Sequence, residues 1–149
     1  MRCTIYNGHP KYRMSGLRSL AKSLERYVPI RYDALSFAFL TEAALCALHV
    51  RFLDDANPTD VITFPALESD EVRMGEICIS VDEALKYEKV QCLSDELTLY
   101  AVHGWLHLAG YDDHTDSDRA LMREMERKTL DFLSAQSTPR IRVQKIRYD

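Results

Sequence analysis

The chain has no long hydrophobic run and few cysteines. None of its apolar stretches approaches the roughly 18 residues that a membrane span requires, and its first residues lack the apolar core of a signal peptide. The four cysteines are spread singly without a CxxC pair, which is typical of reduced core residues and not of zinc ligands. We therefore expect a cytoplasmic protein without a membrane partner.

Acidic residues are scarce at both ends of the chain, although its net charge is −4. Residues 1–31 carry seven Lys/Arg against Glu25 alone, whereas residues 54–83 carry nine acids against Arg73 alone. The basic tail, 136–149, contains four cations and one acid. Basic ends suit a polyanionic partner, although ordinary solvation of surface helices explains the same charges.

Hydrophobic periodicity predicts an α+β fold in a single domain spanning residues 1–149. We expect a mixed sheet of about four strands, at 2–7, 35–40, 59–64 and 73–80. We also expect about five helices, at 14–27, 42–52, 81–89, 94–109 and 115–134, and a turn at 54–58. The tail is either an added edge strand or a disordered basic arm.

Three of the five histidines fall within twelve positions. His103 and His107 are four residues apart and so share one helix face. Gly110 then ends the helix, and the chain returns with three potential ligands, Asp112, Asp113 and His114. A lone HxxxH pair is more often two ordinary side chains, but this concentration favours a zincin-like site on a helix and its following turn. Three ligands with one open position are typical of catalytic zinc.

The residue after the first histidine argues against one class of zinc enzyme. Metalloproteases with an HExxH motif use the glutamate as a base, and this chain has Gly104 there. A peptidase would need a base from elsewhere, such as Glu76, Asp112 or Asp113. We expect Trp105 to belong to the core, and His9 and His49 to be surface residues.

Three motifs together resemble the YbeY family of bacterial endoribonucleases. HGWLHLAGYDDH, from His103 to His114, resembles that family's HGxLHLxGYDH. PTDVITFP (58–65) resembles its PTDVLSFP, and GEICIS (75–80) resembles its G[DE]IxIS. The resemblance spans about residues 30–135, and it is the combination of motifs, in this order and spacing, that makes it specific.

This resemblance implies a zinc-dependent endoribonuclease that prefers single strands, with one Zn²⁺ per chain held by three histidines. It also implies a role in ribosomal RNA maturation, at the 3′ end of 16S rRNA, and in ribosome quality control. The expected partners are rRNA and, in addition, the ribosome or its small-subunit proteins. DNA is not an expected partner. Two rivals stay open: a metalloprotease-like hydrolase of another substrate class, and a non-catalytic ribosome assembly factor with a structural zinc.

The chain departs from the family pattern at two places. The family's third histidine lies six residues after the second, where this chain has Asp113, and His114 follows one residue later. We favour His103, His107 and His114 as the metal ligands and the catalytic centre, with Asp113 as the alternative third ligand. The family's arginine is replaced by Leu53, so Arg51, Arg73 or the basic N-terminal segment must supply a cation, and we take Arg51 as the candidate.

Overall fold

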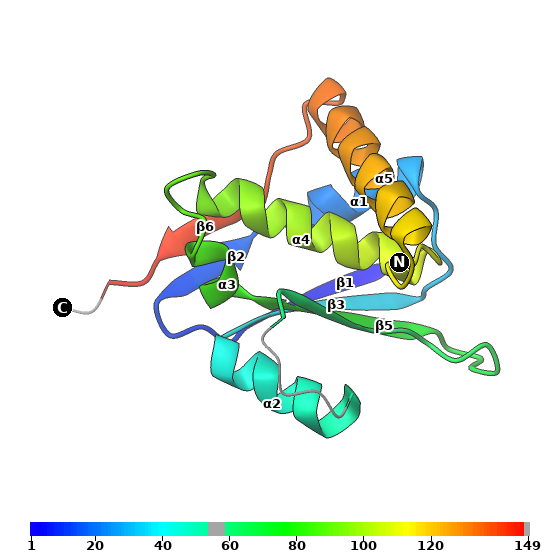
Figure 1. Cartoon of the computed structure of the whole chain (residues 1–149), viewed down its shortest axis with the longest axis horizontal. Helices are drawn as coiled ribbons and strands as arrows, with labels where there is room; N and C mark the ends of the chain where they lie inside the picture. The colour runs from blue at the N-terminus through cyan, green and yellow to red at the C-terminus, as the bar shows by residue number, and fades with distance from the viewer. Residues whose placement is uncertain (54–58, 148–149) are drawn as a thin grey trace.

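The computed structural model describes residues 1–53 and 59–147. Its main sheet is mixed, with β1, β3 and β5 parallel and β4 antiparallel to β5 (Figure 1). In spatial order the strands are β1 (Arg2–Asn7), β3 (Ala34–Leu40), β5 (Met74–Ser80) and β4 (Val61–Phe64). A separate antiparallel ribbon joins β2 (Tyr12–Ser15) to β6 (Arg142–Lys145). The predicted α+β fold with a four-stranded mixed sheet is confirmed.

Five helices accompany the sheet in the described part of the chain. They are α1 (Leu17–Tyr27), α2 (Glu42–Leu53), α3 (Val81–Leu85), α4 (Leu93–Leu108) and α5 (Asp116–Ala135). Figure 1 shows α1, α4 and α5 on one side of the sheet and α2 on the other. None of the described helices is both long and apolar enough to cross a membrane.

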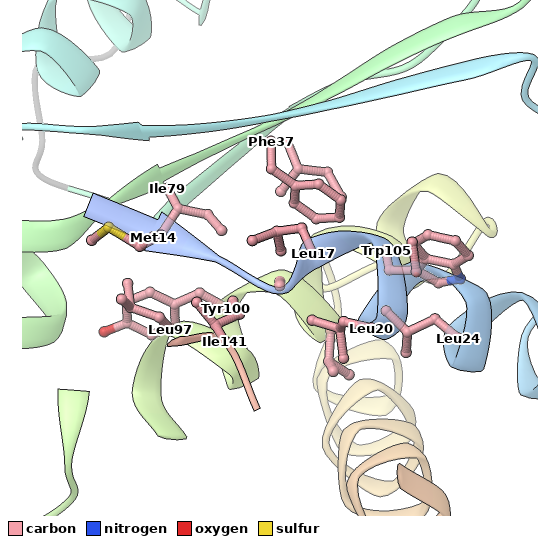
Figure 2. Close-up of a cluster of buried hydrophobic side chains, with 14 of the residues drawn as sticks. Met14, Leu17, Leu20, Leu24, Phe37, Ile79, Leu97, Tyr100, Trp105 and Ile141 are labelled. Carbon is pink, nitrogen blue, oxygen red and sulfur yellow. The ribbon is translucent and has the colours of Figure 1, made fainter. Parts of the chain in front are cut away.

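Alternating side chains of the strands build two apolar clusters, one on each sheet face. Phe37 and Ile79 belong to the larger cluster, which is completed by α1 and α4 (Figure 2). Cys78 points to the opposite face and packs in a smaller cluster with Leu45 of α2. Trp105 is fully buried in the larger cluster and donates its Nε1–H to the carbonyl of Val28 at 2.8 Å, which confirms it as a core residue.

Gly104 allows α4 to lie unusually close to the sheet. A Cβ atom at this position would lie 2.6 Å from Cγ2 of Ile77 and 3.3 Å from Cγ1 of Val61. The position taken by glutamate in HExxH proteins is therefore filled by the sheet. The absence of a side chain here is a packing requirement, because contacts near 2.6 Å force one partner to move.

The structure differs from the sequence expectations mainly at the ends of the chain. The helix expected from residue 14 begins only at Leu17, since Gly16 adopts φ +87° and the preceding residues form β2. The tail forms an edge strand, β6, that pairs with β2 and not with the main sheet. The expectation of a surface His9 was wrong: it is 6% exposed, with Nε2 placed 2.8 Å from Oδ1 of Asp82. The turn expected at 54–58 lies outside the described residues.

We predict that Gly104→Ala lowers the free energy of unfolding by about 1–3 kcal/mol, because the added methyl group overpacks the contact with Ile77. Urea denaturation monitored by circular dichroism measures the change. The double variant Gly104→Ala/Ile77→Ala should lose less than the sum of its single variants, since Ile77→Ala opens the space that the new methyl group needs. Strict additivity would contradict the close contact.

Candidate metal centre

His103 and His107 lie side by side near the C-terminal end of α4. Their Nε2 atoms are 3.0 Å apart, and each side chain is 21% exposed. Two imidazole nitrogens at this distance need a proton or a cation between them, because their lone pairs otherwise repel. The helix thus presents a pair of nitrogen donors at the protein surface.

The end of α4 determines which residues return to this pair. Gly110 adopts φ +104°, and its N–H donates to the carbonyl of His107 at 3.0 Å. The N–H of Tyr111 donates to the carbonyl of Leu106 at 3.0 Å, which completes a Schellman motif. The left-handed glycine reverses the chain, so the residues that follow fold back beside the histidines.

Asp113 is the residue that this turn brings to the pair. Its Oδ2 lies 3.4 Å from Nε2 of His107 and 3.8 Å from Nε2 of His103. Atoms bound about 2.0–2.2 Å from a tetrahedral zinc ion lie roughly 3.3–3.6 Å from one another. The three measured separations, 3.0, 3.4 and 3.8 Å, bracket that value. The donor set therefore fits a divalent metal ion with little movement.

His114, the third ligand favoured from sequence, lies apart from the two helix histidines. Its side chain is 79% exposed, and its Nε2 is 3.0 Å from Oδ1 of Asp112. It groups with Asp112 and Asp113 and not with His103 and His107. The physical reason is the Schellman turn, which places the sixth residue after His107 over the pair and directs the seventh outward.

Glu126 of α5 orients His103 through the ring nitrogen that faces away from His107. Its Oε1 lies 2.7 Å from Nδ1 of His103, and its side chain is only 17% exposed. Because a carboxylate only accepts, Nδ1 carries the hydrogen, and Nε2 of a neutral His103 keeps its lone pair for the metal. Sequence reasoning missed this residue, because nothing in the chain signals a contact between two residues that lie 23 positions apart on different helices.

The electrostatic surroundings of His103 favour positive charge. Burial lowers its pKa, but the hydrogen bond and charge of Glu126, with the charges of Asp60 and Asp113, outweigh burial, so the pKa of His103 is raised. The same negative groups that favour a proton also favour a metal cation. Asp60 has a second, structural contact, since its Oδ1 accepts from the N–H of Val61 at 2.8 Å.

Arg119 holds the turn that carries Asp113. Its Nη1 donates to the carbonyls of Asp113 and His114, both at 3.2 Å, and its Nη2 pairs with Asp116. Thr115 begins α5 with a reciprocal capping box through Asp118. These contacts restrain the segment on both sides of its reversal. Arg119 is a second residue that sequence reasoning missed.

The structure does not bring the candidate arginines to the histidines. Arg51 is on α2, which packs against the opposite face of the sheet (Figure 1), and its guanidinium lies 5.3 Å from the ring centre of Phe52. Arg73 donates to the carbonyls of Arg31 and Leu67 at 2.6 and 3.0 Å. Both side chains thus have local partners elsewhere in the fold.

Comparisons with known proteins agree with one another. A family profile described as Endoribonuclease YbeY matches residues 12–134. A protein named Endoribonuclease YbeY from Protochlamydia amoebophila is 34% identical over 122 residues, covering 78% of this chain and 81% of the relative. One of the same name from Chlamydia muridarum is 38% identical and covers 68% of each chain. The solution structure of TM1509 from Thermotoga maritima has a TM-score of 0.55 and 27% identity, and covers 92% of this chain and 93% of that one.

We predict that Glu126→Gln weakens zinc binding by about 10–100-fold, because the neutral amide no longer fixes and polarises His103 as the carboxylate does. Competition with a chromogenic chelator measures the affinity. Glu124→Gln is the matched control, since Glu124 lies on the same helix but pairs with Lys128 at 3.1 Å on the surface. Equal affinities for the two variants would show that Glu126 does not support the site.

Proposed function

This chain belongs to the YbeY family, and we propose from that premise that it is a metal-dependent endoribonuclease. Its proposed substrate is single-stranded ribosomal RNA in the cytoplasm, and its proposed reaction is phosphodiester hydrolysis during rRNA maturation. The family profile covers residues 12–134, which include the metal cluster. The observation that carries the proposal is the convergence of two imidazole nitrogens and one carboxylate oxygen within 3.8 Å of one another.

We assign His103, His107 and Asp113 as the ligands of one Zn²⁺ per chain. Two nitrogens and one oxygen with an open fourth position are a recurrent donor set for catalytic zinc. When bound, the metal ion supplies Lewis-acid stabilisation of the charge that develops on a phosphate. The chain itself binds the ion through these three side chains, holds the proton of His103 on Nδ1 through Glu126, and restrains the Asp113 turn through Arg119.

An exposed site suits a polymeric substrate. The histidine side chains are 21% exposed and that of Asp113 is 43% exposed, so a nucleic acid backbone reaches them without a channel. A single strand is favoured over a duplex because its backbone adopts the geometry of in-line attack more readily. Arg51 is left out of this assignment, since α2 lies across the sheet.

The rival functions are less well supported. A peptidase would need a general base, but Gly104 is fixed by packing, and Glu76 shares the sheet face of Cys78, from which its Oε1 accepts a hydrogen bond. A structural zinc needs a fourth protein ligand, whereas the cluster with His103 and His107 among the described residues supplies three.

A cleavage assay on end-labelled RNA tests the proposal. The zinc-loaded chain should cut a single strand faster than the same sequence as a duplex, and should leave the matching DNA intact. Chelation or His107→Ala should lower the rate by more than about 100-fold, because loss of a ligand exceeds the effect of losing its supporting group. Arg51→Gln is the matched control and should retain the rate.

Circular dichroism of His107→Ala separates the rivals. The variant should keep its fold, because the side chain of His107 is partly exposed in the last turn of α4. RNA cleavage that survives both chelation and His107→Ala would contradict the proposal. Collapse of the fold in His107→Ala would instead indicate a structural metal.

A further inference from the structure

The two strands outside the main sheet form a strongly basic surface, which we call the basic ribbon. It consists of residues 11–15 and 140–147, which contain β2 and β6. These segments carry six cations and no acid, although the net charge of the chain is −4. The cations are Lys11, Arg13, Arg140, Arg142, Lys145 and Arg147. The family profile covers β2 but ends before β6, so it describes only one of the two strands of this surface.

The ribbon has one anchored face and one open face. Met14 is 1% exposed and Ile141 is fully buried, and both point into the core beside α4 (Figure 2). On the other face the register sets Arg13 opposite Gln144 and Ser15 opposite Arg142, and all four side chains are exposed. Strand geometry therefore fixes the spacing of Arg13 and Arg142 on the open face, while Lys145, opposite Tyr12 at the end of β6, alternates with them.

Most of these cations lack an internal partner. Among the ion pairs of the described residues, the only ribbon member is Arg140, which pairs with Asp95. Burial raises the pKa of the Asp82 carboxyl, but hydrogen bonds with Glu42 and His9 outweigh burial, so the pKa is lowered. The charge of Lys11 adds a smaller lowering effect. The four remaining cations, Arg13, Arg142, Lys145 and Arg147, are exposed.

Three of these four cations, Arg13, Lys145 and Arg147, line an open groove of about 680 Å³. Gln144, Val143 and Ile146 complete its lining. The large apolar side chains that are exposed in the described chain all lie outside the ribbon. Protein partners and membranes usually require exposed apolar anchors. Guanidinium and ammonium groups at the edge of an open groove instead suit the phosphates of a nucleic acid.

The ribbon and the metal centre are attached to the two ends of one helix. Thr98 accepts from the N–H of Ile141 at 3.1 Å, and Ser94 donates to the carbonyl of Ile141, both in the first half of α4. His107 lies 13 residues beyond Ser94, which is about 20 Å along a helix. The helix thus holds the two surfaces at a fixed separation, which an extended RNA strand can span and a dinucleotide cannot.

We propose that the basic ribbon binds the phosphate backbone of the RNA substrate outside the cleavage site. This inference rests on the proposed function and adds a substrate preference to it. RNA that reaches both the ribbon and the metal centre binds more tightly than RNA that reaches the metal centre alone. The ribbon reads charge and not base sequence, since no aromatic residue is among the described residues that line its groove.

Titration of labelled poly(U) with the chelator-treated chain tests this inference, because binding is then measured without cleavage. The variant carries Arg13→Gln, Arg142→Gln, Lys145→Gln and Arg147→Gln. The matched control carries four changes of equal charge on exposed residues elsewhere: Lys89→Gln, Arg123→Gln, Arg127→Gln and Lys128→Gln. Circular dichroism verifies that both keep the fold.

The ribbon variant should bind poly(U) at least about tenfold more weakly at 0.1 M salt, and the slope of log K against log salt should fall in magnitude by about 3, as expected for four lost phosphate contacts. The control should retain most of the affinity. Equal losses in the two variants would mean a general charge effect and would overturn the inference.

Two further outcomes would also overturn it. The first is that the unaltered chain does not bind poly(U). The second is that the ribbon variant binds poly(U) as the unaltered chain does but binds vesicles of anionic phospholipid more weakly. Cleavage of a short RNA by the zinc-loaded ribbon variant is measured separately. If the ribbon variant binds RNA unchanged and the unaltered chain cleaves RNA, only the ribbon inference is refuted. Ribbon-dependent binding in a chain that never cleaves RNA refutes the proposed function alone.

Discussion

The close contact between α4 and β5 is the constraint on which the metal centre depends. Gly104 lets the helix approach until Ile77 fills the space of a missing side chain. That contact fixes the rotation of α4, so His103 faces Glu126 and the third ligand while Trp105 enters the core. The residue that excludes an HExxH-type base is thus the one that positions the histidines. Packing and chemistry share one position.

The proposed third ligand, Asp113, is the residue that the chain reversal after α4 brings to the histidine pair. The Schellman motif at Gly110 reverses the chain, and the sixth residue after His107 lies beside the histidine pair. In this chain that residue is Asp113, and the additional residue, His114, is displaced outward. A carboxylate in place of an imidazole adds a negative charge to the site. The proposed His-His-Asp set still has donor atoms that zinc accepts.

Much of the fold was predictable because its signals are local. Alternation predicted strands β1, β3, β4 and β5, and helical spacing predicted α2, α4 and α5 nearly to their ends. The pairing of β2 with β6 was not predictable, since it joins segments about 130 residues apart. The histidine pair could be found from its spacing, whereas the contact of Glu126 with His103 spans 23 residues and could not. The third position was ambiguous because residue spacing alone does not show whether Asp113 or His114 faces the histidine pair.

The most direct test of this account is the zinc content of the purified chain and of two variants, measured by elemental analysis. The unaltered chain and His114→Ala should each hold one zinc per chain, and Asp113→Ala should hold far less. This outcome would establish a His103, His107 and Asp113 centre. Loss of zinc from His114→Ala with retention in Asp113→Ala would contradict the account, because the metal would then lie where the described turn does not place it.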